Sequence, residues 1–306
     1  MTARPYRRDS GHLPAKVSFI LNELAANRRH GAHELSVRAL RSIGILMKTL
    51  RAQPPAYQRH QLRVFATKLR SAQPAMGSFL EWSRELEQLS REEIDPRISS
   101  SLRKWERVWT QRLRMETGAA VRHAVEEFPP GARVLTLSRS DTVFRTLTGL
   151  GLARAPAQVV VLRSEPGGEG AVLANDLVHA GLSVSLIEDH QGASRVADAD
   201  LLLVGADAIF EDGSLIHKVG TRHLAEAARE YGVPTMSVTG LSKWVSGNPP
   251  HAKPPPLFDR TPAREVRGYW TDGGLLRPSE VSRVARQLLP SVVTRPRVKP
   301  SVGLPA

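Results

Sequence analysis

The clearest candidate for proton transfer is an aspartate that directly follows an apolar run. Val204-Gly205-Ala206-Asp207 places a carboxyl group just past the end of an expected strand, and the glycine permits close approach of a ligand or a neighbouring backbone. A carboxyl group there can give or take a proton, or hold a sugar hydroxyl. It can equally cap the turn that leads into Phe210-Glu211-Asp212-Gly213, so the sequence leaves both roles open.

A second candidate lies where another apolar run gives way to a helix. Thr136-Leu137-Ser138-Arg139-Ser140 combines hydroxyls, a cation and backbone N–H groups, which together suit an anion. We therefore place Ser138 and Arg139 among the predicted ligand contacts. The competing interpretation is that Ser140 or Asp141 only caps the helix, and for Asp141 alone that interpretation is favoured.

A third candidate, His217-Lys218-Val219-Gly220-Thr221, runs into a predicted helix that begins near its last residue. Lys218 supplies a point charge, Gly220 permits close backbone approach, and the helix N-terminus supplies oriented N–H groups. His217 and Thr221 add side chains that form hydrogen bonds. This segment is therefore predicted to bind phosphate.

A glycine-rich turn, Pro166-Gly167-Gly168-Glu169-Gly170, is a further candidate for anion binding, and Gly170 begins the next predicted helix. The turn does not match the GxGxxG fingerprint of dinucleotide-binding proteins.

The chain has no cysteine, which excludes disulfides, thiolate zinc sites, iron–sulfur clusters and thiol nucleophiles. The ten histidines show no metal-ligand spacing, so no metal and no cofactor are expected.

A sheet must position these turns. After Gly131, short runs rich in Val, Leu and Ile alternate with helical segments. Strands are predicted over 133–137, 158–162, 183–187, 201–205 and 235–238, and helices over 141–150, 170–180, 191–196 and 221–231. Near-continuous apolar strands that alternate with helices predict an α/β fold with a Rossmann-like, doubly wound parallel sheet. Ligands of such sheets bind beyond the carboxyl ends of the strands, at the topological switch point.

The first 130 residues differ, because their apolar residues recur at helical spacing. Pro54-Pro55 and Pro74 separate the shorter segments, and a long helix is expected from Asp95-Pro96 to Phe128. We predict three parts: a helical N-terminal domain over 1–130, an α/β ligand-binding domain over 131–294, and a disordered basic tail over 295–306.

Charge and hydropathy restrict the partners. The net charge is +13, and a basic helical half could dock nucleic acid or an acidic partner. Because Lys and Arg are interleaved with Asp and Glu, solvated helix faces are favoured instead, and no nucleic-acid partner is expected. No window approaches the roughly 18 consecutive apolar residues of a membrane helix, and no signal-peptide pattern follows the basic N-terminus. We expect no membrane association and a cytoplasmic location.

Several motifs between Gly170 and Pro234 follow one another in a recognisable order. They are Gly170-x-x-Leu173-Ala174-x-Asp176-Leu177, Gly181 to Ile187, Val204 to Ile209, Gly213, Lys218-Val219-Gly220-Thr221-x-x-Leu224-Ala225 and Val233-Pro234. In this order they resemble the initiation factor 2B alpha/beta/delta regulatory subunit family, which includes ribose-1,5-bisphosphate isomerase and methylthioribose-1-phosphate isomerase. The helical half resembles the family only loosely, through Gly31-Ala32-x-Glu34-Leu35.

The resemblance implies roles for particular residues. The isomerases of this family move a carbonyl from C1 to C2 of an opened phosphorylated aldose, with a cysteine and an aspartate. The aspartate falls on Asp207 and the cysteine on Ser138, whose hydroxyl is far too weak an acid to replace a thiol unaided. The family pattern Glu-x-Arg-Pro reads Arg163-Ser164-Glu165-Pro166 here, so either Arg163 reaches the phosphate from another position or the pocket takes another ligand. His217 stands where asparagine is common.

Three functions remain open at this point. The first is a protein that binds a phosphorylated sugar or a nucleoside phosphate, and the second is an aldose–ketose isomerase that uses Asp207 on a ribose phosphate. The third is a non-enzymatic regulatory or assembly subunit of an initiation factor 2B-like guanine nucleotide exchange complex, whose partner is a translation GTPase. Family members associate through their α/β halves, so the resemblance implies a homodimer or a larger homo-oligomer.

Overall fold

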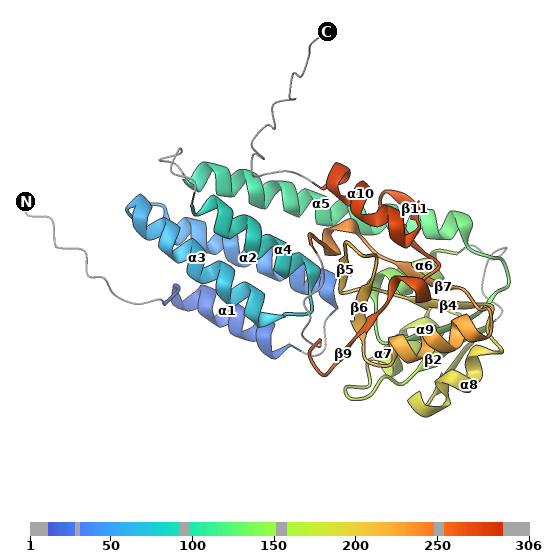
Figure 1. Cartoon of the computed structure of the whole chain (residues 1–306). Coiled ribbons are helices and arrows are strands. Elements are labelled where there is room, and N and C mark those ends of the chain that lie inside the picture. The colour runs from blue at the N-terminus through green and yellow to red at the C-terminus, as the bar shows by residue number, and fades with distance from the viewer. Residues whose placement is uncertain (1–11, 28–30, 92–97, 151–157, 248–253, 290–306) are drawn as a thin grey trace, which may run out of the picture.

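The computed structural model describes residues 12–27, 31–91, 98–150, 158–247 and 254–289 of the 306-residue chain. Figure 1 shows a group of helices on one side and a sheet flanked by helices on the other. The predicted basic tail at 295–306 and residues 248–253 of a proline-rich segment lie outside the described residues. Within the described ranges, no helix is long and apolar enough to span a membrane.

Five helices of the described chain precede the first strand. They are α1 (Ala15–Ala26), α2 (Ala32–Leu50), α3 (Pro55–Ala72), α4 (Gly77–Leu89) and α5 (Ile98–Glu127). Proline at its first position starts α3, where an N–H would have no intrahelical partner. Trp82, Trp105 and Trp109 are fully buried with ring centroids 5.5 to 6.4 Å apart, so aromatic packing forms the centre of this bundle.

Helix α5 belongs to two hydrophobic cores. Its first half, including Leu102 and Leu113, packs in the core of the helical bundle. Its last turns, with Ala120 and Ala124, pack in a core that includes the strands of the sheet. Figure 1 shows α5 running from the bundle across to the sheet. One continuous helix therefore fixes the bundle against the sheet.

The main sheet has seven strands in the order β11-β10-β7-β4-β1-β2-β3. β1 (Arg133–Leu137), β2 (Gln158–Leu162), β3 (Val184–Ile187), β4 (Leu201–Val204), β7 (Thr235–Val238) and β10 (Gly268–Thr271) are parallel, and β11 (Gly274–Leu276) is antiparallel at one edge. The predicted doubly wound parallel sheet is confirmed. The order reverses between β1 and β4, so the switch point lies beyond the carboxyl ends of those two strands.

Helices cover both faces of this sheet, because successive side chains of a strand point to opposite faces. α6 (Asp141–Gly149), α7 (Glu169–His179) and the end of α5 cover the face on which Val134 is buried. α8 (Gly192–Val196), α9 (Thr221–Glu230) and α10 (Pro278–Leu288) cover the face on which Leu135 is buried. The near-continuous apolar strands of the sequence are explained by this double cover.

The sequence predicts no second sheet, yet four short strands form one beside the switch point. They are β5 (Ala208–Phe210), β6 (Leu215–Lys218), β8 (Trp244–Val245) and β9 (Phe258–Thr261), in the order β8-β5-β6-β9. β5 and β8, with three and two residues, are too short to show a periodic pattern. Gly213, at a φ of 75°, supplies the left-handed turn between β5 and β6. This small sheet brings the end of β6 to the switch point.

Candidate functional site

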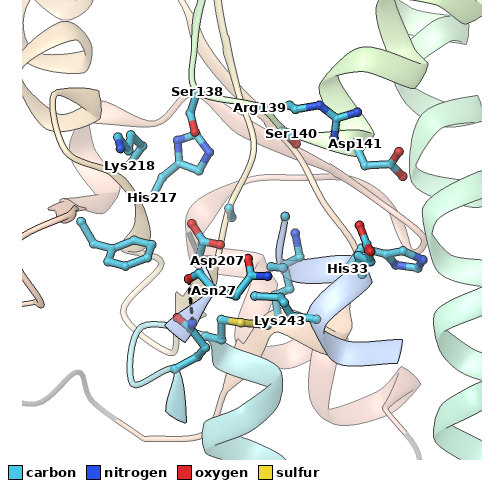
Figure 2. Close-up of a pocket in the computed structure, with 18 of the residues that line it drawn as sticks. Asn27, His33, Ser138, Arg139, Ser140, Asp141, Asp207, His217, Lys218 and Lys243 are labelled. Atoms are coloured by element: carbon cyan, nitrogen blue, oxygen red, sulfur yellow. Dashed lines mark hydrogen bonds between the residues drawn. The ribbon is translucent and has the colours of Figure 1, made fainter. Parts of the chain in front are cut away.

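A cavity of about 930 Å³ lies between the start of α2 and the carboxyl edge of the main sheet. Its walls also include the β1–α6 turn, the segment after β4, the end of β6, and a short 3-10 turn, Leu241–Lys243. Figure 2 shows Ser138, Asp207, His217 and Lys218 around this pocket. Ser138 follows β1, Asp207 follows β4, and His217 and Lys218 are the last two residues of β6. The cavity therefore occupies the place where a doubly wound sheet binds its ligand.

Ser138 begins the β1–α6 turn in an uncommon backbone conformation. Its φ is 62°, in the left-handed region that non-glycine residues seldom adopt. The Ser138 N–H donates to the hydroxyl of Ser164 at 2.6 Å, and Ser164 itself has a φ of 68°. Such strain persists only where surrounding contacts hold it, and it is concentrated at functional sites. Two residues later, Ser140 caps α6 by accepting a hydrogen bond from the Val143 N–H at 3.4 Å.

Asp207 lies on the cavity wall with its backbone held from two sides. Its N–H donates to the carbonyl of Ile216 at 2.8 Å, and its carbonyl accepts from the N–H of Gly77, the first residue of α4, at 2.8 Å. Burial raises the pKa of its carboxyl to about 6, although the positive charges of Lys243 and Lys218 oppose the rise. This carboxyl can therefore both hold and release a proton near neutral pH.

Lys218 reaches the cavity with its charge already compensated. Its ammonium donates to the carbonyl of Pro166 at 2.7 Å and to one oxygen of Glu169 at 3.0 Å, and the second Glu169 oxygen is 2.8 Å away. These contacts use two of the three ammonium protons and neutralise its charge with the Glu169 carboxylate. The neighbouring His217 is buried, and burial, reinforced by the charges of Lys243 and Lys218, lowers its pKa to about 3.

Gly220 and Thr221 do not line the cavity, although both were predicted phosphate contacts. The N–H of Gly220 donates to Asp259 at 2.6 Å, and the hydroxyl of Thr221 donates to the carbonyl of Lys218 at 2.6 Å. These two donors, which the sequence assigned to a ligand, are therefore engaged by the chain itself.

Of the three remaining predicted contacts, one lines the cavity and two lie away from it. Arg139 lines the cavity, and its guanidinium pairs with Asp176 at 3.0 Å. Arg163 lies off the cavity and pairs with Glu188 at 2.9 Å. Gly170 is also off the cavity, where a Cβ atom would lie 1.7 Å from a backbone oxygen of β2. Its role is to let α7 pack closely against β2.

Lys243 is a cavity residue that the sequence-based prediction missed. In the part of the chain that the structure describes, no hydrogen bond or ion pair engages its ammonium. Burial lowers the pKa of this lysine, and the carboxylates of Asp207, Glu116 and Asp141 oppose that change. A lone lysine at the end of a short 3-10 turn belongs to no motif that sequence reasoning could have used.

Two carboxylates hold the 3-10 turn in place. Glu116 of α5 accepts hydrogen bonds from the N–H of Ser242, at 3.1 Å, and from its hydroxyl. Asp272 accepts from the N–H of Leu241 at 2.9 Å. Arg112 pairs with Asp272 and lies 3.8 Å from Glu116. Burial, together with the charge of Asp272, raises the pKa of Glu116 to about 7. The turn is thereby fixed to both α5 and the β10–β11 hairpin.

The start of α2 completes the cavity with a positive rim. Arg38 and Arg41 line the cavity, and the helix begins without a side-chain cap. His33 also lines it, but burial lowers the pKa of its imidazole, which therefore adds no positive charge. Arg38 pairs with Glu34 on its own helix at 2.7 Å, and Arg145 of α6 likewise pairs with Asp141 at 2.8 Å. The positive end of the helix dipole adds to these charges. The rim therefore favours an anionic ligand.

Together these groups can bind an anion and move a proton. The cavity combines a cation at Lys243, a neutral imidazole at His217, and a carboxyl at Asp207 that titrates near neutral pH. Among the described residues, no group of three or more His, Asp or Glu side chains could hold a metal ion. The chemistry that this chain's own residues support is acid–base transfer on a bound, anionic, hydroxyl-bearing molecule.

Comparison with curated proteins gives relatives of two kinds. The chain is 32% identical over 171 residues to a ribose 1,5-bisphosphate isomerase of Haloferax volcanii, covering 47% of this chain and 52% of the relative. It is 33% identical over 189 residues to a methylthioribose-1-phosphate isomerase of Gemmatimonas aurantiaca, covering 51% and 54%. The match thus spans about half the length of these isomerases. A putative translation initiation factor eIF-2B subunit 2-like protein of Pyrococcus abyssi is 27% identical over 281 residues, covering 87% and 98%.

Solved structures show the same fold. A translation initiation factor eIF-2B of Pyrococcus horikoshii OT3 superposes with a TM-score of 0.74 at 23% identity, covering 87% of this chain and 98% of that one. The tetrameric eIF2B-beta2-delta2 complex of C. thermophilum gives a TM-score of 0.75 at 18% identity, covering 90% and 95%. The model of the initiation factor 2 subunit family matches residues 28–249, which is well over half of the chain. The chain therefore belongs to the initiation factor 2 subunit family.

Proposed function

We propose that this chain binds a phosphorylated sugar or a nucleoside phosphate in the cavity between α2 and the sheet. The observation that supports this most is the ammonium of Lys243, which faces the cavity without a hydrogen bond or ion pair from the described residues. An amine in such a place forms strong charge-assisted hydrogen bonds with phosphate oxygens. The positive rim at the start of α2 supports the same anion, and Asp207 and His217 supply partners for its hydroxyls.

Aldose–ketose isomerisation of a ribose phosphate is the reaction that we propose for this site. Two relatives are named as isomerases of phosphorylated riboses. A carboxyl with a pKa of about 6 suits Asp207 to carry a proton between two carbons of the ligand. Ser138 stays a neutral hydroxyl at this pH, so we assign it hydrogen bonding to the ligand and leave proton transfer to Asp207.

The alternative is a non-enzymatic regulatory or assembly subunit of an initiation factor 2B-like complex, with a translation GTPase as partner. It is favoured by the extent of one match, which covers 98% of a protein named as an eIF-2B subunit 2-like factor. In either case we propose a cytoplasmic homodimer or larger homo-oligomer, since one related structure is a tetrameric complex.

A thermal-shift screen of the purified chain separates these functions. The probes are ribose 1-phosphate, ribose 5-phosphate, ribose 1,5-bisphosphate, methylthioribose 1-phosphate, AMP and GMP, with NMR of each binding probe over time. Binding raises the melting temperature by mass action. Stabilisation with conversion to a ketose supports the isomerase, stabilisation alone supports a sensor or regulatory subunit, and no stabilisation by any probe contradicts the proposed ligand site.

Asp207→Asn tests the proton-transfer role. The variant should keep ligand binding and lose turnover, because an amide cannot exchange a proton at neutral pH. Asp198→Asn is the matched control, since Asp198 is exposed and pairs only with Arg195 at 3.4 Å among the ion pairs of the described chain. Full turnover in Asp207→Asn would rule out the assigned role.

A further inference from the structure

Two hydrogen bonds determine which nitrogen of His217 has the proton. The hydroxyl of Thr221 lies 2.6 Å from the carbonyl oxygen of Lys218 and 3.1 Å from Nδ1 of His217. A carbonyl can only accept, so the single proton of the hydroxyl goes to Lys218. Nδ1 of His217 must then donate to the Thr221 oxygen. The imidazole is therefore protonated on Nδ1.

The second nitrogen, Nε2, consequently has a lone pair. Burial, reinforced by the charges of Lys243 and Lys218, lowers the pKa of His217 to about 3, so the ring stays neutral at physiological pH. Nε2 is then a hydrogen-bond acceptor, although it lies among the cations of the cavity.

Among the described residues, no neighbour donates a proton to Nε2. Ser140 is close, because a Cβ atom on Gly205 would lie 2.6 Å from the Ser140 oxygen and 3.3 Å from Nε2 of His217. However, the Thr142 hydroxyl donates to the carbonyl of Val238 at 2.6 Å. The Ser140 hydroxyl, 2.9 Å from that of Thr142, must therefore donate to Thr142. The acceptor on His217 is left for a ligand.

A lone pair repels a phosphate oxygen, which is also an acceptor, and attracts the proton of a hydroxyl. We propose that Nε2 of His217 accepts a hydrogen bond from a ligand hydroxyl and so orients the ligand, with its hydroxyls at His217 and Asp207 and its phosphate at Lys243. This inference rests on the proposed function. It makes His217 a specificity-determining residue and Thr221 a positioning residue that acts through His217.

Long-range proton–nitrogen NMR of histidine-labelled protein tests the protonation directly. We expect the free protein to show His217, assigned by its loss in His217→Asn, with a pyrrole-type Nδ1 and a pyridine-type Nε2 resonance. Both should stay unchanged as the pH falls from about 8 to about 5, where an ordinary histidine would titrate. A protonated Nε2 beside an unprotonated Nδ1 would overturn the proposal.

Titration with ribose 5-phosphate, ribose 1-phosphate and, separately, inorganic phosphate tests the contact itself. A sugar phosphate should shift the Nε2 resonance in the direction of a hydrogen-bonded acceptor, whereas inorganic phosphate should leave it in place. Sugar phosphate binding without a shift of Nε2 would overturn this contact alone. Failure of every phosphorylated probe to bind would overturn the proposed function, and the contact with it.

A pair of substitutions at Thr221 tests the positioning role. Thr221→Val removes the acceptor for Nδ1 at similar volume, whereas Thr221→Ser keeps it. We expect the valine variant to lose about tenfold in affinity for the sugar phosphate and little for inorganic phosphate, and the serine variant to restore the wild-type NMR pattern and affinity. An equal loss for both probes in the valine variant would indicate a general structural effect and overturn the positioning role.

Discussion

The cavity has two lysines on different walls, and their surroundings differ. Lys218 ends a strand of the small sheet, and its ammonium is engaged by Pro166 and Glu169. Lys243 ends a 3-10 turn, and within the described residues its ammonium has neither a hydrogen bond nor an ion pair. The lysine that a sequence motif identifies is thus the one whose charge the protein has already compensated. Whether a lysine can offer its charge to a ligand therefore depends more on the groups around it than on the sequence motif that contains it.

The largest effect should follow from removing the available charge. Lys243→Met should weaken the binding of phosphorylated ligands by up to about 100-fold, since a charge-assisted hydrogen bond contributes about 1.5–3 kcal/mol. Isothermal titration with the strongest probe of the screen measures the loss. Lys48→Met, a change at an exposed site on α2 away from the cavity lining, is the control. An affinity within about twofold of wild type would break the comparison.

Removing the charge of Lys218, which Glu169 compensates, should reduce ligand affinity less. A second substitution at Glu169 should restore most of that affinity. Lys218→Met leaves the Glu169 carboxylate unpaired beside the ligand, so we expect affinity to fall about tenfold. The double variant Lys218→Met/Glu169→Gln removes that carboxylate charge and should regain most of the affinity. Titrations of the two single variants and the double variant give the coupling energy. A double variant as weak as Lys243→Met would show that Lys218 binds the ligand directly.

Loosening the turn should reduce the contribution of Lys243 to ligand affinity without removing its charge. Glu116→Ala leaves the N–H and hydroxyl of Ser242 without their acceptor, so the turn should become mobile. We expect affinity to fall about fivefold and the free energy of unfolding to fall by about 1–3 kcal/mol. Denaturant unfolding and ligand titration measure both. A destabilised variant with unchanged ligand affinity would show that fixing the turn does not contribute to ligand binding.

The smallest effect concerns Asp207, whose charge both lysines stabilise. Its pKa is about 6 in the folded chain against an ordinary 3.8, so between these values the folded state binds more protons than the unfolded state. The carboxyl therefore destabilises the fold as pH rises through this window. Relative to wild type, Asp207→Asn should gain roughly 1 kcal/mol as pH rises through that window and keep the gain above it, because partial exposure weakens the effect. Urea unfolding at several pH values measures it, and a constant difference would contradict the raised pKa.

The sequence could predict the sheet and the place of the site because both depend on local patterns. Near-continuous apolar runs predicted the strands, and polar residues one to three positions after β1 and β4 led to Ser138 and Asp207 at the switch point. The order in which parallel strands join is strongly constrained, so their carboxyl ends could be placed together without coordinates.

The rest depends on contacts between distant parts of the chain. Glu116 and Ser242, which fix the turn of Lys243, are 126 residues apart in sequence. Likewise, nothing in the local pattern shows that Glu169 compensates Lys218 or that Asp259 takes the N–H of Gly220. The motif at His217 to Thr221 was found, but how its donors are used was decided by the fold.

Gly77 restricts which substitutions the junction between the helical half and the sheet can accept. A Cβ atom there would lie 2.0 Å from the carbonyl oxygen of Lys243, while its N–H binds the carbonyl of Asp207 at 2.8 Å. One small residue of the helical half thus lies against the backbone of two residues to which we assign chemistry, Asp207 and Lys243. If recombination replaced one half with that of a diverged relative, the residue at position 77 would still have to fit against the backbone of Lys243 and Asp207. The two halves are therefore expected to be inherited together, as one unit of selection.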